Sequence, residues 1–276
     1  MIPSKVNYHK PDNISDAIAL LKEHGDDCKV LAGGHSLIPV LKLRLNDPDH
    51  LVDITGISEL KEIRDNDKSI TIGACATHAD IANNDALKKH APLIAIAAGM
   101  IGDRQVRNFG TIGGSIAHAD PAADWPAVLL AADANIVIKN ADGQREVDVD
   151  QFFKGLFTTA LNDGEIISAI RIAKTSLNAN STYVKFAQPA SRFALVGCAV
   201  AMDKGANNAR VAFSGVSATP FRDTGIEKAL AGGASAADAT ANAADGVSVM
   251  SDHYAKENYR KHLAGVYARK ALAEVM

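Results

Sequence analysis

Two glycine pairs constrain most strongly how this chain folds and what it binds. One lies in residues 32–36 (AGGHS) and the other in residues 111–115 (TIGGS). Each follows a short apolar run and places several backbone N–H groups in a row. Glycine permits positive φ and close approach of a ligand, and consecutive N–H groups followed by a helix form an anion site. Two such sites favour a ligand with two phosphates, so a dinucleotide cofactor is the leading hypothesis.

The glycine pairs do not match the common nucleotide-binding patterns. Neither G-x-G-x-x-G nor G-x-x-x-x-G-K-[ST] is present. A plain turn is therefore an alternative for each pair alone. Ser36 and Ser115 follow the glycines and provide a further hydrogen-bond donor for a phosphate. Because the same arrangement occurs twice, we favour the phosphate interpretation.

The composition indicates an ordinary globular protein with two or three compact units. The chain has 276 residues, of which 47% are hydrophobic and 22% charged, and its net charge is −3. This charge gives no reason to expect nucleic acid or an anionic membrane as a partner. Residues 1–5 lack the pattern of a secretory signal, and no apolar run approaches the roughly 20 residues that cross a bilayer. We therefore expect a cytoplasmic protein.

The cysteines are isolated in the sequence. Cys28, Cys75 and Cys198 form no C-x-x-C pair. Disulfides, and zinc or iron–sulfur sites held by this chain alone, are not predicted. We expect three small buried side chains.

Hydrophobic periodicity predicts a mixture of helices and strands. Helices are expected from Ile14 to a stop at Gly25, from a cap at Thr77, and over residues 37–45, 93–100, 121–132, 225–231, 236–249 and 254–275. Strands are expected over residues 29–32, 51–54, 69–74, 135–139, 165–172, 182–188, 195–202 and 211–216. The polar stretch 174–180 is the best candidate boundary. The predicted units are residues 1–55, 56–175 and 176–276.

The segment after the second glycine pair is the most distinctive part of the sequence. His118, Asp120 and Asp124 suggest a metal site, but no further ligand is apparent and none is predicted. Pro121 indicates a helix start with Asp120 as its N-cap, which places Asp124 one turn inside. Asp124 then accepts hydrogen bonds from a ribose hydroxyl or a flavin ring, or is a solvated acid.

Three basic residues are further candidates. Arg104 and Arg107 approach a pyrophosphate, face a partner subunit or lie in solvent. Lys185 alternates with apolar neighbours and points into a cofactor site or lies on an exposed strand face. No nucleophile–base set is recognisable. An electron carrier, in which the cofactor supplies the chemistry, is therefore favoured over a complete catalyst.

Residues 32–45 (AGGHSLIPVLKLRL) and 111–131 (TIGGSIAHADPAADWPAVLLA) resemble the FAD-binding medium subunits of the molybdenum hydroxylases, the group of carbon monoxide dehydrogenase and xanthine dehydrogenase. The resemblance extends over the whole chain. It implies an α+β fold of the vanillyl-alcohol-oxidase (PCMH) type, in which two subdomains hold FAD, plus a small C-terminal α+β domain. The cofactor-binding residues that it implies are Ala32, Gly33, Gly34, His35, Ser36, Leu37, Ile101, Thr111, Ile112, Gly113, Gly114, Ser115, Asp124 and Lys185.

The resemblance also implies partners. These are a large molybdopterin subunit and a small subunit with [2Fe-2S] clusters, assembled as a dimer of heterotrimers. Electrons would pass from the clusters through FAD to an acceptor. Ile101 and Phe193 replace a phenylalanine and a tyrosine of some relatives, which bears on acceptor handling. Two alternatives stay open: a stand-alone FAD-dependent oxidase or reductase, and a non-enzymatic phosphate- or nucleotide-binding module. The substrate and the acceptor are not predicted.

Overall fold

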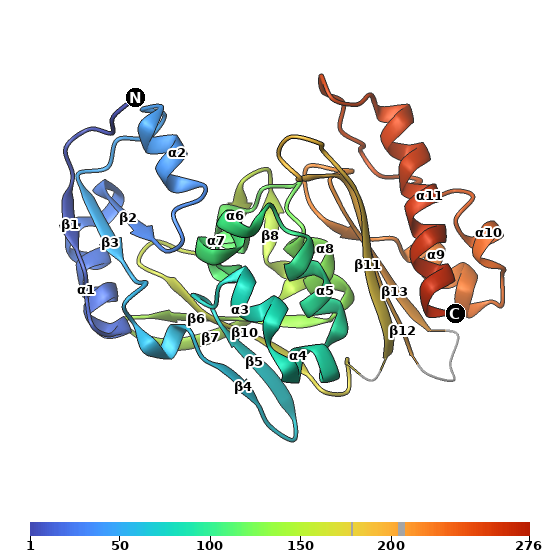
Figure 1. Cartoon of the computed structure of the whole chain (residues 1–276), viewed down its shortest axis with the longest axis horizontal. Coiled ribbons are helices and arrows are strands. Elements are labelled where there is room, and N and C mark those ends of the chain that lie inside the picture. Colours follow the sequence, from blue (N-terminus) through green and yellow to red (C-terminus); the bar gives the residue numbers. More distant parts are fainter. Residues whose placement is uncertain (178, 204–207) are drawn as a thin grey trace.

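The computed structural model describes residues 1–177, 179–203 and 208–276. Its larger sheets follow one another along the chain (Figure 1). Each of these sheets has a hydrophobic core beside it. The predicted α+β class is confirmed. Residue 178, within the predicted boundary stretch, lies outside the described residues. Short 3-10 helices span Gly25–Asp27, Ser58–Leu60 and Val149–Gln151.

The first sheet is parallel and has the order β1-β3-β2. Its strands are β1 (Asn7–His9), β2 (Cys28–Leu31) and β3 (His50–Asp53), and its helices are α1 (Ile14–His24) and α2 (Leu37–Lys42). Helix α1 buries its apolar stripe against the sheet and ends at Gly25, whose φ is 53°. Helix α2 ends before the predicted residue 45, because Arg44 has a left-handed φ of 54°.

The central sheet is antiparallel and has the order β4-β5-β10-β6-β7. Its strands are β4 (Ile63–Asp65), β5 (Ser69–Gly73), β6 (Ala134–Asn140), β7 (Gly143–Asp148) and β10 (Ile166–Ala173), with a separate hairpin of β8 (Phe153–Gly155) and β9 (Thr158–Thr159). The helices beside it are α3 (His78–Asn83), α4 (Asp85–His90), α5 (Pro92–Met100), α6 (Arg104–Phe109), α7 (Ile112–His118) and α8 (Trp125–Ala131). The capping box predicted at the start of α3 is present, between Thr77 and Asp80.

The third sheet is antiparallel and has the order β11-β12-β13-β14. Its strands are β11 (Ala179–Ala187), β12 (Ala194–Asp203), β13 (Ala209–Ser214) and β14 (Phe221–Arg222), followed by α9 (Thr224–Ala231), α10 (Ala236–Ala239) and α11 (Glu257–Val275). Helix α11 packs on β11 and β12, while α5 and α8 of the central unit also contact this sheet. The third sheet therefore lies between α11 and the rest of the protein (Figure 1).

The helix predicted over residues 236–249 is wrong beyond Ala239. Ala244 and Gly246 have φ values of 58° and 72°, which no right-handed helix contains. The turn brings the buried N–H of Ala244 to the carboxylate of Asp223 at 2.8 Å. A tertiary hydrogen bond thus outweighs the helix propensity of an alanine-rich segment.

Cys28, Cys75 and Cys198 are buried free thiols, as the sequence predicted. Burial raises the pKa of Cys75 to about 12 and also raises the pKa of Cys28 and Cys198. Within the described residues, no helix combines the length and apolarity that crossing a bilayer requires.

Strand β10 is the centre of the largest core, and Ile170 is its most informative position. Ile170 is fully buried and pairs with Ile72 on β5 and Ile136 on β6. We expect Ile170→Ala to lower the free energy of unfolding by about 2–5 kcal/mol, through lost burial and an unfilled cavity. The matched Ile170→Val should cost only about 0.5–1.5 kcal/mol. Denaturant titrations of both variants measure these changes. Equal losses in the free energy of unfolding would contradict the tight packing of Ile170 in the core.

Candidate functional site

A cavity of about 590 Å³ is lined by segments of the first sheet and its helices, by the central sheet and its helices, and by the turn between β11 and β12. Of the expected cofactor-binding residues, all but Ile112 and Lys185 line it. The expected residues on its wall are Ala32, Gly33, Gly34, His35, Ser36, Leu37, Ile101, Thr111, Gly113, Gly114, Ser115 and Asp124. The structure thus brings together the two glycine segments, which are far apart in the sequence.

The first glycine segment presents a row of unused hydrogen-bond donors. It follows β2 and leads into α2. In the described part of the chain, the backbone N–H groups of residues 33–37 have no acceptor. Buried backbone N–H groups are almost always hydrogen-bonded in a folded protein. A row of N–H groups without acceptors is therefore suited to an anionic ligand.

Both glycines of the first segment are required by geometry. A Cβ on Gly33 would lie 2.0 Å from the carbonyl oxygen of Phe109 and 2.9 Å from the Cα of Gly110. Gly34 has a φ of 72°, a conformation that side chains disfavour. Gly33 therefore permits contact with the chain just before the second glycine segment, and Gly34 permits the turn itself.

The second glycine segment is built differently from the prediction. It forms the first turn of α7 and not a loop before a helix, with Thr111 as the N-cap. Its N–H groups are used within the protein: those of Ile112 and Gly113 donate to the carbonyls of Ala76 and Ala74, and that of Gly114 donates to the Thr111 hydroxyl. This segment therefore shapes the cavity wall and does not offer these N–H groups to a ligand.

Small size explains the second glycine pair. A Cβ on Gly113 would lie 2.5 Å from the Cβ of Ala74, and one on Gly114 would lie 2.8 Å from the Thr111 Oγ1. Ile112 faces the core and not the cavity. The hydroxyls of Ser36 and Ser115 both reach the cavity wall and have no hydrogen-bond partner among the described residues. They remain available to a ligand.

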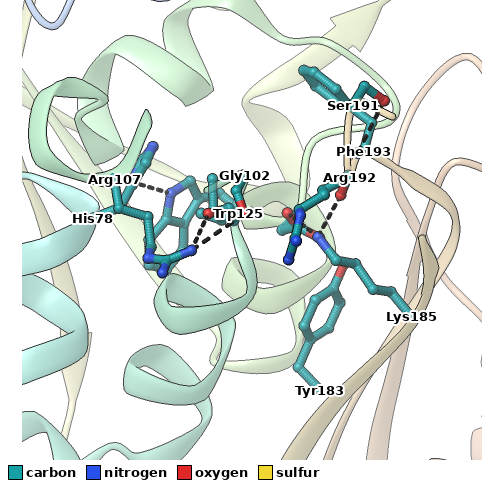
Figure 2. A network of polar contacts seen from close by, with 11 residues as sticks. His78, Gly102, Arg107, Trp125, Tyr183, Lys185, Ser191, Arg192 and Phe193 are labelled. Atoms are coloured by element: carbon teal, nitrogen blue, oxygen red, sulfur yellow. Dashed lines mark hydrogen bonds and ion pairs between the residues drawn. The ribbon is translucent and has the colours of Figure 1, made fainter. Parts of the chain in front are cut away.

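Asp124 is a buried anchor and not a solvated acid. Helix α8 begins at Trp125, so Asp124 precedes the helix and does not lie one turn inside it. Only 5% of Asp124 is exposed, and its carboxylate accepts hydrogen bonds from the Tyr183 hydroxyl and, at 2.9 Å, from the Lys185 ammonium (Figure 2). Asp120 does not cap α8; its carboxylate accepts from the N–H of Ala122 at 2.8 Å.

Lys185 lies behind the cavity wall. Its ammonium donates to Asp124 and, at 2.7 Å, to the carbonyl of Arg192, and 3% of its side chain is exposed. Arg192 has a left-handed φ of 61° and leads to Phe193 on the cavity wall (Figure 2). Lys185 thus positions the turn that carries Phe193. Because the Lys185 side chain is buried, the alternative that it lies on an exposed strand face is wrong.

Burial raises the pKa of Asp124, and the Lys185 ammonium and Tyr183 hydroxyl oppose this rise. Burial and the adjacent carboxylate raise the pKa of Tyr183 well above its ordinary value. Tyr183 was not singled out from the sequence. It shares a face of β11 with Lys185, which strand alternation alone would indicate.

His78 is a second residue that the sequence analysis missed. It lines the cavity and is 4% exposed. The indole N–H of Trp125 donates to His78 Nδ1 at 3.2 Å (Figure 2), which places the ring proton on Nε2. Burial, together with His35 and Arg107, lowers the pKa of His78 to about 3. His78 therefore adds a neutral ring to the wall.

Arg107 holds another segment of the cavity wall in place by hydrogen bonds. Its guanidinium donates to the carbonyls of Ile101 and Gly102 at 2.9 and 3.2 Å (Figure 2). Gly102 has a φ of 50°. Arg107 therefore positions the turn that carries Ile101, while Arg104 is exposed and does not line the cavity.

Comparisons with known proteins identify relatives along the whole chain. Residues 4–175 match the family described as the FAD binding domain in molybdopterin dehydrogenase, and residues 181–275 match the CO dehydrogenase flavoprotein C-terminal domain. The carbon monoxide dehydrogenase medium chain of Hydrogenophaga pseudoflava is 38% identical over 99% of this chain and 97% of its own. The glyceraldehyde dehydrogenase medium chain of Sulfolobus acidocaldarius is also 38% identical, with complete coverage of both chains.

A solved structure agrees with these matches. A chain of the carbon monoxide dehydrogenase of Hydrogenophaga pseudoflava superimposes with a TM-score of 0.95 at 37% identity, over 100% of this chain and 98% of that one.

The Asp124–Lys185 pair predicts a pH-dependent loss of stability. Lys185→Met leaves a buried carboxylate without its cation, so the free energy of unfolding should fall by about 3–5 kcal/mol near neutral pH. Loss of the ammonium raises the pKa of Asp124 further in the folded state. The folded variant then binds more protons than the unfolded chain, so its deficit should shrink as pH falls toward the ordinary carboxyl range. Denaturant titrations at several pH values between about 5 and 8 measure how this loss in the free energy of unfolding changes with pH.

The exposed pair of Lys88 and Asp85, 3.4 Å apart, supplies the matched control. Lys88→Met should change the free energy of unfolding by less than about 1 kcal/mol at every pH. A constant deficit for Lys185→Met across this pH range would contradict the assignment of Asp124 as the titrating group.

Proposed function

The chain belongs to the FAD-binding medium subunits of the CO dehydrogenase-like molybdenum hydroxylases, and on that premise we propose that it relays electrons from [2Fe-2S] clusters of a partner subunit, by means of bound FAD, to an external acceptor. The chain is thus an oxidoreductase subunit whose cofactor is FAD, while molybdenum and iron–sulfur centres belong to partner subunits. The observation that carries the proposal is the row of N–H groups at residues 33–37, which have no acceptor among the described residues and lie on the wall of one large cavity.

The described residues fit FAD. The N–H groups of residues 33–37 and the hydroxyls of Ser36 and Ser115 would hold the pyrophosphate and the adjoining chain. An apolar part of the wall, which includes Ile54, Ile101 and Ile167, would cover the ring. When bound, FAD supplies a ring system that accepts and releases electrons. His78 and Arg107 would act by positioning the wall.

The two buried carboxylates of the wall, Asp124 and Glu165, support relay over substrate chemistry. Both oxygens of Asp124 are used by Tyr183 and Lys185. The carboxylate of Glu165 accepts from the Arg145 Nε at 2.7 Å, and Arg145 holds the pKa of Glu165 at about 2. A general base needs a pKa near the working pH and access to the substrate, so the strongly acidic Glu165 and the buried, ion-paired Asp124 do not suit that role. This favours an electron carrier over the alternative of a stand-alone oxidase or reductase.

We further propose that the substrate is chosen outside this chain. The two relatives at 38% identity are named for different substrates, carbon monoxide and glyceraldehyde. A large molybdopterin subunit would select and oxidise the substrate, and a small subunit would carry the [2Fe-2S] clusters. Assembly as a dimer of heterotrimers and the domain limits 1–55, 56–175 and 176–276 are parts of the same proposal.

The electron-relay proposal predicts the redox behaviour of the purified chain. We expect a flavin absorbance spectrum, release of FAD identified by its mass, and bleaching by a chemical reductant. Carbon monoxide or an aldehyde should leave the isolated chain oxidised, because Asp124 and Glu165 are committed to internal partners. Bleaching by such a substrate without partner subunits would favour the stand-alone enzyme instead. A chain that binds no FAD after reconstitution would refute both.

The contact at Gly33 predicts a specific loss of FAD affinity. Gly33→Ala places a methyl group against the backbone at Phe109, so the two sides of the cavity must move apart. Gly34→Ala introduces strain of about 1–2 kcal/mol at its positive φ. We expect each variant to bind FAD at least tenfold more weakly, which corresponds to about 1.4 kcal/mol. Titration of the deflavinated protein with FAD measures the change.

Gly99→Ala is the matched control, because Gly99 lies in α5 and a Cβ there would meet no atom within 4 Å. Its FAD affinity should equal that of the unchanged chain. Circular dichroism and thermal melts of all three variants separate loss of binding from loss of folding. Full FAD affinity in the folded Gly33→Ala variant would refute the placement of FAD at this segment.

A further inference from the structure

Three histidines converge in the first unit, away from the cavity. His9 ends β1, His24 ends α1 and His50 begins β3. These elements lie side by side at the N-terminal end of the protein (Figure 1), and β1 pairs in parallel with β3. None of the three residues lines the cavity. The sequence analysis gave them no role.

The ring nitrogens of these histidines are close enough to share one ion. One nitrogen from each ring lies within 4.8 Å of the others. His9 Nε2 and His50 Nδ1 are 2.8 Å apart and form a hydrogen bond, which requires an unprotonated nitrogen as acceptor. The rings of His24 and His50 stack with their centroids 3.7 Å apart. The cluster therefore brings three imidazoles together, and at least one of the paired nitrogens is unprotonated.

We propose that His9, His24 and His50 bind one divalent transition-metal ion of the zinc class. Neutral imidazole suits zinc, copper and nickel, whereas calcium and magnesium require oxygen ligands. With Zn–N bonds of about 2.0–2.1 Å, tetrahedral geometry places the nitrogens about 3.3 Å apart. The observed separations, from 2.8 Å up to at most 4.8 Å, include that value. The rings reach the ion by turning about their side-chain bonds.

The surroundings indicate what kind of site this is. All three side chains are partly buried, so the ion remains open to solvent and water completes its coordination. The ligands come from an edge strand of only three residues, the end of a helix and the adjacent strand. Binding would tie β1 and α1 to β3. The ion has a structural role, holding the first sheet and α1 together, and takes no part in flavin chemistry.

Zinc binding to the full-length, FAD-loaded chain tests the proposal. Equilibrium dialysis against micromolar zinc chloride, with zinc measured by mass spectrometry, should give about one ion per chain. His24→Ala and His50→Ala should each weaken zinc binding at least tenfold. Saturating zinc should raise the Tm of the unchanged chain by about 2–4 °C and should not raise that of the two variants.

His262→Ala is the matched control, because His262 is exposed on α11 outside the cluster. It should retain the zinc affinity and the Tm shift of the unchanged chain. FAD content should be equal in all four proteins. Zinc binding that survives in both cluster variants would overturn the proposal, and so would an unchanged chain that takes up no zinc at 100-fold molar excess.

Discussion

The backbone at Gly33 lies against the backbone of Phe109 and Gly110, and this contact joins the two sides of the cavity. A side chain at position 33 would overlap the Phe109 carbonyl, so only glycine permits the approach. The contact places the free N–H groups of residues 33–37 opposite the start of α7. Both glycine segments line one cavity, and this close approach joins them.

The two glycine pairs look alike in the sequence and act differently in the structure. The first presents N–H groups to the cavity, whereas those of the second are used by Ala74, Ala76 and Thr111. Sequence reasoning predicted that both segments meet one ligand because the same arrangement of two glycines and a serine occurs twice. It did not predict the asymmetry, because whether an N–H group is free depends on carbonyls that other strands and turns bring nearby.

Most secondary structure was predictable because apolar spacing and caps are local, as in α1 and the capping box at Thr77. The polar contacts of the site were not. Asp124 meets Tyr183 and Lys185 across 59 and 61 residues, and His78 meets Trp125 across 47. The Asp124 pairs form only when the third sheet packs against α5 and α8, and the His78 pair forms only when α3 and α8 both pack on α5. No local pattern encodes that packing. The histidine cluster escaped prediction for the same reason, since β1 must pair with β3 first.

The third unit is part of the cavity's construction and not an appendage. Tyr183 and Lys185 project from one face of β11, and Gly197 on β12 leaves room for the Tyr183 hydroxyl, which a Cβ there would approach to 2.3 Å. Together they neutralise and desolvate Asp124, and Lys185 also fixes the turn that carries Phe193. Without this sheet, the carboxylate of Asp124 would face solvent beside the cavity. The charge next to the cavity is therefore set by the third sheet, although the row of backbone N–H groups on the cavity wall, at residues 33–37, follows β2 of the first sheet.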